Sequence, residues 1–369
     1  MSSFIHKFSI LAVVLSITGL CAEPQKTAPD TAVSNADSNT TETSLPYIQG
    51  EGITKEEMAS GYNAPGRIDL KGPWDSWAEG SFIFWQALEE NIYVARSDVR
   101  STTDYPRNQV YYNMDFDYNP GLKAGIGHSL DQHDNWSIFI RYTGLHQKNK
   151  VNCQFNEYVI IPSFYAGYSG IFITSAKAKW RLNFDMVDLE VMRAFYLGTR
   201  LITKPFVGLK GGYIKQKYHN TITNYNANIG TYYPFYHGDV NSWKLGARTG
   251  CDLSWFISRS FRVDANVALD LLYANFKSMF TNYLYAGTAS NMYTLTATKN
   301  TDVIQPVFET SLGFGWGIYF CSDRLHFDVS TVYEFQVFLR ENQFLFEQMY
   351  DDMGGLYLHG LTANFRLGF

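Results

Sequence analysis

Apolar and polar side chains alternate with a period of two residues along unusually long segments of this sequence. In residues 243–255 the odd positions are apolar except for Thr249, and the even positions are polar, charged or glycine. A period of two indicates a β-strand with two chemically different faces. The segment is also longer than the roughly five or six residues of an ordinary strand. We therefore expect an all-β protein whose strands are long enough to cross a membrane.

The same alternation recurs along most of the chain after residue 74. It is found in residues 114–126, 178–191, 263–271, 308–318 and 327–336. Within 178–191 the apolar side chains move from even to odd positions, and this shift predicts a β-bulge near Met186–Val187.

Composition excludes several classes of protein. Only 18% of the residues are charged and 17% are aromatic, whereas about 25% are charged in typical soluble domains. After the N-terminus no apolar run reaches the roughly 20 residues of a membrane-spanning helix. The net charge of −5 argues against a large nucleic-acid surface. A soluble sandwich also alternates, but its strands are shorter, and Trp and Tyr near the strand ends favour the aromatic girdles of a membrane barrel.

The connections between the alternating segments are short and long in turn. Bacterial outer-membrane barrels have short periplasmic turns and long extracellular loops. The pattern predicts a transmembrane, antiparallel, up-and-down β-barrel of about ten strands, within a range of about 8 to 14, with both termini in the periplasm. The expected strands lie near 76–95, 108–127, 136–147, 176–193, 205–219, 242–256, 261–276, 303–320, 325–340 and 356–369.

The N-terminal part has a different character. Residues 1–22 predict a signal peptide, with an apolar run at 8–20 and Ala22 at the cleavage position. A short membrane anchor and a lipoprotein acylated at Cys21 are the alternatives. Residues 23–73 are polar and predict a disordered or linker segment in the periplasm, which leaves 74–369 for the barrel. Export and a barrel together predict the outer membrane of a Gram-negative bacterium.

The last strand ends in an aromatic residue and carries apolar residues on one face. This pattern resembles the C-terminal signal read by the barrel-assembly machinery; the alternative is an ordinary last strand. The residues of the expected assembly signal are Tyr357, Leu361, Phe365, Leu367 and Phe369.

The polar face of the strands predicts a charged lumen with both signs present. Such charges either tune passage through a wet pore or form ion pairs that fill a narrow barrel, since a barrel of about eight strands is filled by its own side chains. The expected lumen-lining residues are Asp115, Asp117, Lys123, Arg141, Lys179, Arg181, Asp185, Lys210, Lys244, Arg248, Asp252, Arg262, Asp264, Asp270, Glu309, Glu334 and Arg366.

Three of the alternating segments also resemble a known family. Residues 77–90, 115–127 and 205–214 are similar to the major outer-membrane-protein family of Legionella and of Chlamydia-related bacteria. The resemblance covers roughly 74–369. It implies a pore-forming β-barrel at the cell surface, and it supplies no catalytic motif.

Three functions remain open at this stage. The leading hypothesis is a porin for passive diffusion of small hydrophilic solutes and ions, with outer-membrane lipid, the assembly machinery and its solutes as partners. The second is a surface structural protein or adhesin, as a homo-oligomer or bound to a host surface, through loops 152–168 and 221–236. The third is a protease at the outer rim, using Asp115 and Asp117 with His237 and Asp239.

We expect no enzyme activity, cofactor, metal site or nucleic-acid partner. Cys153 falls in an expected outer loop and is a candidate for an intermolecular disulfide.

Overall fold

The computed structural model describes most of the chain after residue 74. The described residues are 75–97, 110–130, 136–155, 159–160, 173–197, 200–226, 230–232, 235–258, 260–285, 292–321, 324–345 and 354–369. The predicted signal peptide and periplasmic linker lie outside these ranges.

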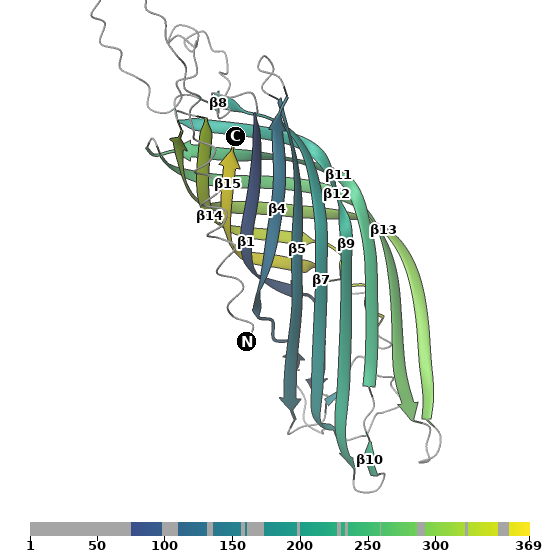
Figure 1. Cartoon of the computed structure of the whole chain (residues 1–369). Coiled ribbons are helices and arrows are strands. Elements are labelled where there is room, and N and C mark those ends of the chain that lie inside the picture. The colour runs from purple at the N-terminus through teal and green to yellow at the C-terminus, as the bar shows by residue number, and fades with distance from the viewer. Residues whose placement is uncertain are drawn as a thin grey trace, which may run out of the picture.

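Ten strands of the described chain close into an antiparallel barrel (Figure 1). Its neighbours pair in chain order, and β15 closes the barrel against β1. The strands are β1 (Ser76–Glu89), β4 (Tyr118–Ser129), β5 (Trp136–Gln154), β7 (Ile173–Arg193), β9 (Leu201–Asn226), β11 (Phe235–Phe256), β12 (Phe261–Tyr285), β13 (Met292–Phe320), β14 (Leu325–Phe338) and β15 (Leu356–Gly368). The predicted up-and-down barrel of about ten strands is confirmed.

Five shorter strands complete the described structure. β8 (Phe195–Leu197) and β10 (Gly230–Tyr232) are short strands that each pair with β9. β2 (Tyr93–Ser97), β3 (Tyr111–Asn113) and β6 (Val159–Ile160) form a separate three-stranded sheet. The first two predicted strands, 76–95 and 108–127, each combined a barrel strand with part of this small sheet.

The barrel is strongly asymmetric in height. Strands β5, β7, β9, β11, β12 and β13 have 19 to 29 residues, whereas β14, β15, β1 and β4 have 12 to 14. Figure 1 shows the long strands running well past the short ones, away from the end where the short turns lie. We call the end with the short turns the turn end and the opposite end the loop end. The part of the long strands that extends beyond the short strands is called the wall. The predicted loops 220–241 and 277–301 are in large part strands of the wall, and the wall strands β5 and β7 also include both ends of the predicted loop 148–175.

Outward-facing apolar side chains form a belt at the turn-end half of the barrel, which we call the lipid band. On β12 it runs from Phe261 to Tyr273 and on β11 from Trp255 to Trp243, and these four aromatic end residues are exposed. Twelve residues span about 40 Å of strand, which covers about 28 Å of the membrane normal at the usual tilt. Aromatic rings at both limits match the girdles of a membrane barrel.

The two faces of the wall exchange their chemistry beyond the lipid band. On β7 the exposed residues change from Val187 and Leu189 to Lys179 and Arg181, while the buried face becomes apolar, with Leu182 fully enclosed. The register of β7 with β5 and β9 is continuous from Ser175 to Met192. The predicted bulge near Met186–Val187 is therefore wrong. The strand leaves the lipid band at this level, so the surroundings of its two faces change while its register continues without a bulge.

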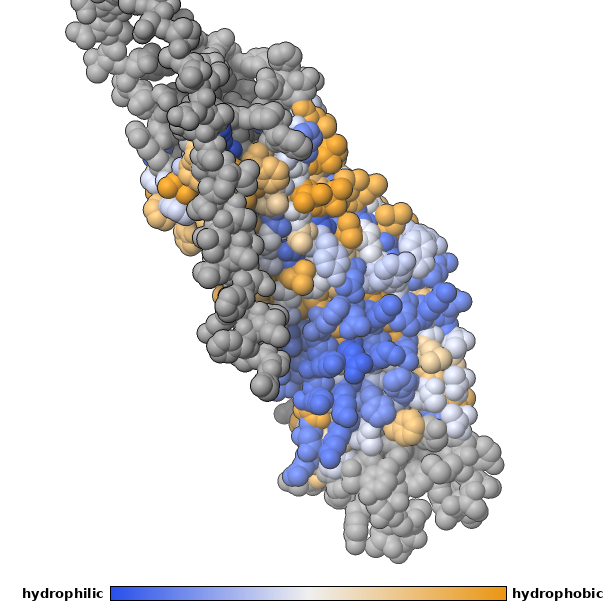
Figure 2. All heavy atoms as spheres, viewed as in Figure 1, coloured by the Kyte–Doolittle hydropathy of each residue, from blue (hydrophilic) through white to orange (hydrophobic). Residues whose placement is uncertain are grey.

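The inside of the wall holds the apolar core. Wall residues such as Trp180 and Phe276 pack there with Val94 of the small inner sheet and Phe344 of the segment after β14. Arg340 adopts φ 58°, and the next four residues are buried. Figure 2 shows the matching outer surface: hydrophobic side chains gather over the upper part of this face, and hydrophilic ones cover the lower part.

Candidate functional site

Seven charged side chains from six neighbouring strands meet inside the barrel at the level of the lipid band. We call them the central network. All are buried except Arg141, which is about one-fifth exposed. The members are Arg141 on β5, Asp188 and Glu190 on β7, Lys210 on β9, Arg248 on β11, Asp270 on β12 and Glu309 on β13.

Arg248 binds three carboxylates of this network. Its Nε lies 2.8 Å from Glu190 Oε1, its Nη1 2.9 Å from Asp270 Oδ1, and its Nη2 2.8 Å from Glu309 Oε2. The guanidinium group suits this arrangement because its donors point in several fixed directions.

Lys210 makes the second set of contacts. Its Nζ lies 3.2 Å from Asp188 Oδ1 and 3.4 Å from Asp270 Oδ2, and it also pairs with Glu309. Arg141 Nη2 lies 3.2 Å from Asp188. The network thus contains three cations and four carboxylates, and these pairs occupy the bore at mid-membrane.

A further pair crosses the side of the barrel made of short strands. Lys123 Nζ on β4 lies 2.6 Å from Glu334 Oε2 on β14. The same ammonium lies 4.7 Å from the ring centroid of Trp85 on β1. Because β1 and β15 lie between β4 and β14 in the sheet, this contact bridges strands that are not hydrogen-bonded to each other.

A second charged layer lies near the turn end. Arg262 Nε is 2.7 Å from Asp264 Oδ1, and its Nη2 donates to Asp328 Oδ1 at 2.8 Å. Arg366 of β15 lies with its guanidinium 4.4 Å from the ring centroid of Trp77. The charges inside the barrel are therefore arranged in layers along its axis.

A third contact lies toward the loop end, which we call the lock. Lys244 Nζ on β11 is 2.7 Å from Glu341 Oε2 and donates to Gln305 Oε1 at 2.8 Å. Gln305 also donates to Glu341 Oε2 at 2.8 Å. Both charged side chains are completely buried. Glu341 belongs to the segment after β14, so the lock fastens this segment inside the barrel.

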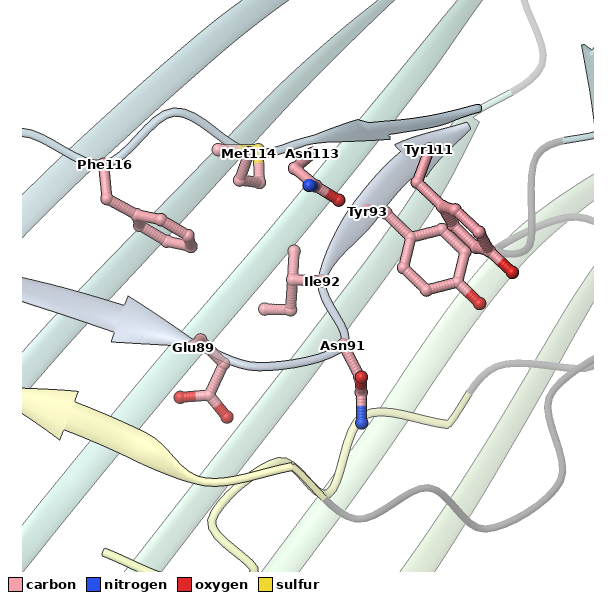
Figure 3. A pocket seen from close by; sticks show the side chains of 8 residues that line it. All are labelled: Glu89, Asn91, Ile92, Tyr93, Tyr111, Asn113, Met114 and Phe116. Atoms are coloured by element: carbon pink, nitrogen blue, oxygen red, sulfur yellow. The ribbon is translucent and has the colours of Figure 1, made fainter. Parts of the chain in front are cut away.

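A cavity of about 610 Å³ lies at the loop end of β1. Figure 3 shows its lining: Glu89 at the end of β1, Ile92 beside it, and Tyr93 and Tyr111 from the small inner sheet. The rings of Tyr93 and Tyr111 meet edge to face at 5.3 Å. Glu89 is buried and lies within electrostatic reach of both charged members of the lock.

Most of the expected lumen-lining residues lie inside the barrel. Each sits on the inward face of its strand, and most are held by the pairs described above. They are Lys123, Arg141, Lys210, Lys244, Arg248, Asp252, Arg262, Asp264, Asp270, Glu309, Glu334 and Arg366.

Three of the expected lumen residues lie on the outer surface, and their assignment is wrong. Lys179, Arg181 and Asp185 project outward from β7, because the faces exchange chemistry above the lipid band. Asp185 instead accepts a hydrogen bond of 2.6 Å from the outward-facing Tyr142 hydroxyl. Asp115 and Asp117 are exposed in the segment between β3 and β4.

The residues considered for a rim protease are not brought together. His237 Nε2 and Asp239 Oδ2 lie 3.0 Å apart on β11. Asp115 and Asp117 precede β4, and β5, β7 and β9 separate β4 from β11. Within the described ranges, no three His, Cys, Asp or Glu residues could hold a metal ion.

Cys153 lies in β5 and not in an outer loop. It is a free thiol, half-buried, and it packs against the apolar core inside the wall. Its role in an intermolecular disulfide stays a prediction. Leu361 and Phe365 on β15, and Phe369 directly after the strand, are exposed residues.

The sequence interpretation missed the lock. Glu341 and Gln305 were assigned no role, since Glu341 sits in an expected loop and Gln305 is uncharged. The one available signal was Phe344 and Leu345 beside Glu341, because apolar residues in a loop indicate that it is buried.

Comparison with known proteins gives a family and distant structural likenesses. The family model described as the Legionella pneumophila major outer membrane protein precursor matches residues 69–366. No curated protein matches the chain. The described residues contain no helix long and apolar enough to cross a membrane.

Three solved structures illustrate the structural likeness. The outer membrane protease OmpT of Escherichia coli is 11% identical, with 82% of this chain and 98% of that chain covered and a TM-score of 0.39. Ail of Yersinia pestis is 8% identical (79% and 98% covered, TM-score 0.23). The toluene transporter TodX of P. putida is 7% identical (80% and 90% covered, TM-score 0.27).

Proposed function

This chain belongs to the family of the Legionella pneumophila major outer membrane protein precursor. We propose that it is an outer-membrane channel for small hydrophilic solutes and ions, and that the channel is closed in the present structure. The observation that carries the proposal is the central network: the bore at mid-membrane is filled by charged side chains. An apolar filling would close a narrow barrel permanently. Charged groups can exchange their partners for water or for a passing ion.

The energetics of buried charge support this interpretation. Replacing a buried ion pair by well-packed apolar side chains is often neutral or stabilising. A barrel needed only as a rigid support would therefore gain little from seven charges at its centre. Because the network has four carboxylates and three cations, we expect the open channel to favour cations slightly, since fixed charges set the local ion concentration.

The lock is the proposed gate. It holds the segment after β14 inside the barrel through the pair Lys244–Glu341. Glu89, which lines the cavity at the loop end, lies within electrostatic reach of this pair. Release of Glu341 would let the segment move outward and connect the cavity with the layers below.

Recordings in planar bilayers test this proposal. Lys244→Gln leaves Glu341 without its cation, and breaking a buried pair in this way costs about 3–5 kcal/mol. We expect this variant to conduct far more often than the native protein. The double exchange Lys244→Glu with Glu341→Lys restores the pair and should restore the closed state. Lys299→Gln, an exposed residue of the wall on β13, is the control.

The proposal fails if neither the native protein nor Lys244→Gln conducts while both are folded by heat-modifiable gel migration. In that case the second candidate, a surface structural protein or adhesin, takes its place. The observation that favours this candidate is the wall, which extends the barrel well beyond the lipid band. It would be tested by binding of the reconstituted protein to host-cell surfaces.

A further inference from the structure

The outer surface of the wall carries a dense group of cations just beyond the lipid band. Three adjacent strands contribute two exposed side chains each. We call this group the basic patch: Lys148 and Lys150 on β5, Lys179 and Arg181 on β7, and Lys215 and Lys217 on β9. Figure 2 shows hydrophilic side chains over the lower part of these strands.

The strand register places like charges directly opposite each other. Lys150 pairs in register with Lys179, Lys148 with Arg181, and Arg181 also with Lys217. Side chains in such positions have Cβ atoms about 4.5–5.5 Å apart, and like charges there destabilise the sheet. A group of cations in this arrangement has a strong electrostatic preference for an anion laid across it.

The wall itself supplies little compensating negative charge. Lys217 lies 3.0 Å from Asp239, and among the described residues it is the only one of the six with a carboxylate in ion-pair distance. The other nearby carboxylate, that of Asp185, is hydrogen-bonded to Tyr142 and His146. The patch therefore keeps a large net positive charge.

The position of the patch identifies the source of the anion. On β9, Lys215 follows the exposed Tyr213 of the lipid band by two residues, which is about 7 Å of strand. Tyr142 on β5, also at the limit of the band, lies six residues before Lys148. The patch begins where acyl chains end, at the depth of lipid headgroups.

We propose that the basic patch binds phosphate-bearing headgroups of the outer leaflet, and so fixes a shell of anionic lipid against one side of the barrel. Phosphate oxygens accept several charge-assisted hydrogen bonds from Lys and Arg. Each cation near an anionic lipid surface strengthens binding by about fivefold. The cross-strand pairs let one phosphate contact two strands at once.

The test compares unfolding of the full chain in vesicles of phosphatidylcholine alone and of phosphatidylcholine mixed with phosphatidic acid. The variant Lys150→Gln with Lys179→Gln removes one directly opposed pair. The matched control is Lys277→Gln with Lys299→Gln, two exposed cations of β12 and β13. Folding of each variant is checked by heat-modifiable gel migration.

We expect phosphatidic acid to raise the unfolding midpoint of the native protein and of the control, and to raise that of the patch variant much less. Lipid retained after extraction, counted as phosphatidic acid per protein, should fall about tenfold or more in the patch variant. In pure phosphatidylcholine the patch variant should be at least as stable as the native protein, since the substitution relieves repulsion.

Two results would overturn the proposal. The first is an equal response of patch variant and control, which would make the effect one of net charge. The second is the same rise in midpoint from soluble pyrophosphate in phosphatidylcholine vesicles, which would make the source a soluble anion. Neither result bears on the channel, whose test uses conductance.

Discussion

Lys123 and Glu334 lie 2.6 Å apart inside the barrel although 211 residues separate them in the chain. They reach each other over β1 and β15, so the pair forms only when the barrel is closed. Both side chains are largely buried. Their energetics therefore report on closure of the barrel itself.

Removing one partner of this pair should destabilise the barrel more than removing both. Lys123→Met leaves the Glu334 carboxylate buried without its cation, at a cost of about 3–5 kcal/mol. The double variant Lys123→Met with Glu334→Leu should recover most of this loss. Free energies of unfolding from urea titration in lipid vesicles measure the coupling. Additive effects of the two single substitutions would contradict the buried pairing.

The lipid band predicts a sharp difference between substitutions on β12. Leu269 is more than half exposed on the outward face, so Leu269→Arg places a charge in the acyl chains. We expect a loss of about 2–4 kcal/mol in unfolding free energy. Leu269→Ala is the control, because it keeps the site apolar. Similar losses in both variants would show that Leu269 does not face lipid.

Beyond the lipid band the inner face of β7 is apolar and the outer face is polar. Substitutions of inward-facing residues on β7 should therefore be the destabilising ones. Leu182 is completely buried inside the wall, and Arg181 beside it is exposed. Leu182→Ala should cost about 2–5 kcal/mol as a cavity in a packed core, whereas Arg181→Gln should be close to neutral. Trypsin cleavage of the wall in proteoliposomes measures its local opening. If Leu182→Ala leaves cleavage unchanged, the inside of the wall is not a packed core.

Cys153 should be a poorly reactive thiol. It is half-buried and packs against the apolar core, and thiols are attacked only when accessible. We expect a bulky maleimide to label Cys153 slowly. The rate of labelling at Cys153 is the rate for the native protein minus the rate for the Cys153→Ala variant. Lys150→Cys, exposed on the same strand, provides the fast reference. Rapid labelling of Cys153, or a dimer on a non-reducing gel, would restore the intermolecular disulfide predicted from the sequence.

The architecture of this protein can be predicted from the pattern of its residues alone. Period-two alternation over long segments specifies strands with one lipid face, and alternating short and long connections specify an up-and-down barrel. Each of the ten barrel strands overlaps one of the strands expected from these two patterns, although the first two expected strands also include residues of β2 and β3. Interior side chains at the level of the lipid band, such as Arg248 and Asp270, are predicted on the correct face because the surroundings of each face are constant there.

The level at which this rule stops is visible only in the folded barrel. Lys179 and Arg181 obey the same alternation as Arg248, but they lie beyond the lipid band, where the outer face is polar and the inner face packs on the apolar core. The alternation of apolar and polar side chains shows that the two faces of a strand differ. It does not show whether each face meets lipid, water or the packed interior. The partner of Lys244 was equally hidden, since Glu341 reaches it only when the segment after β14 folds inward through space.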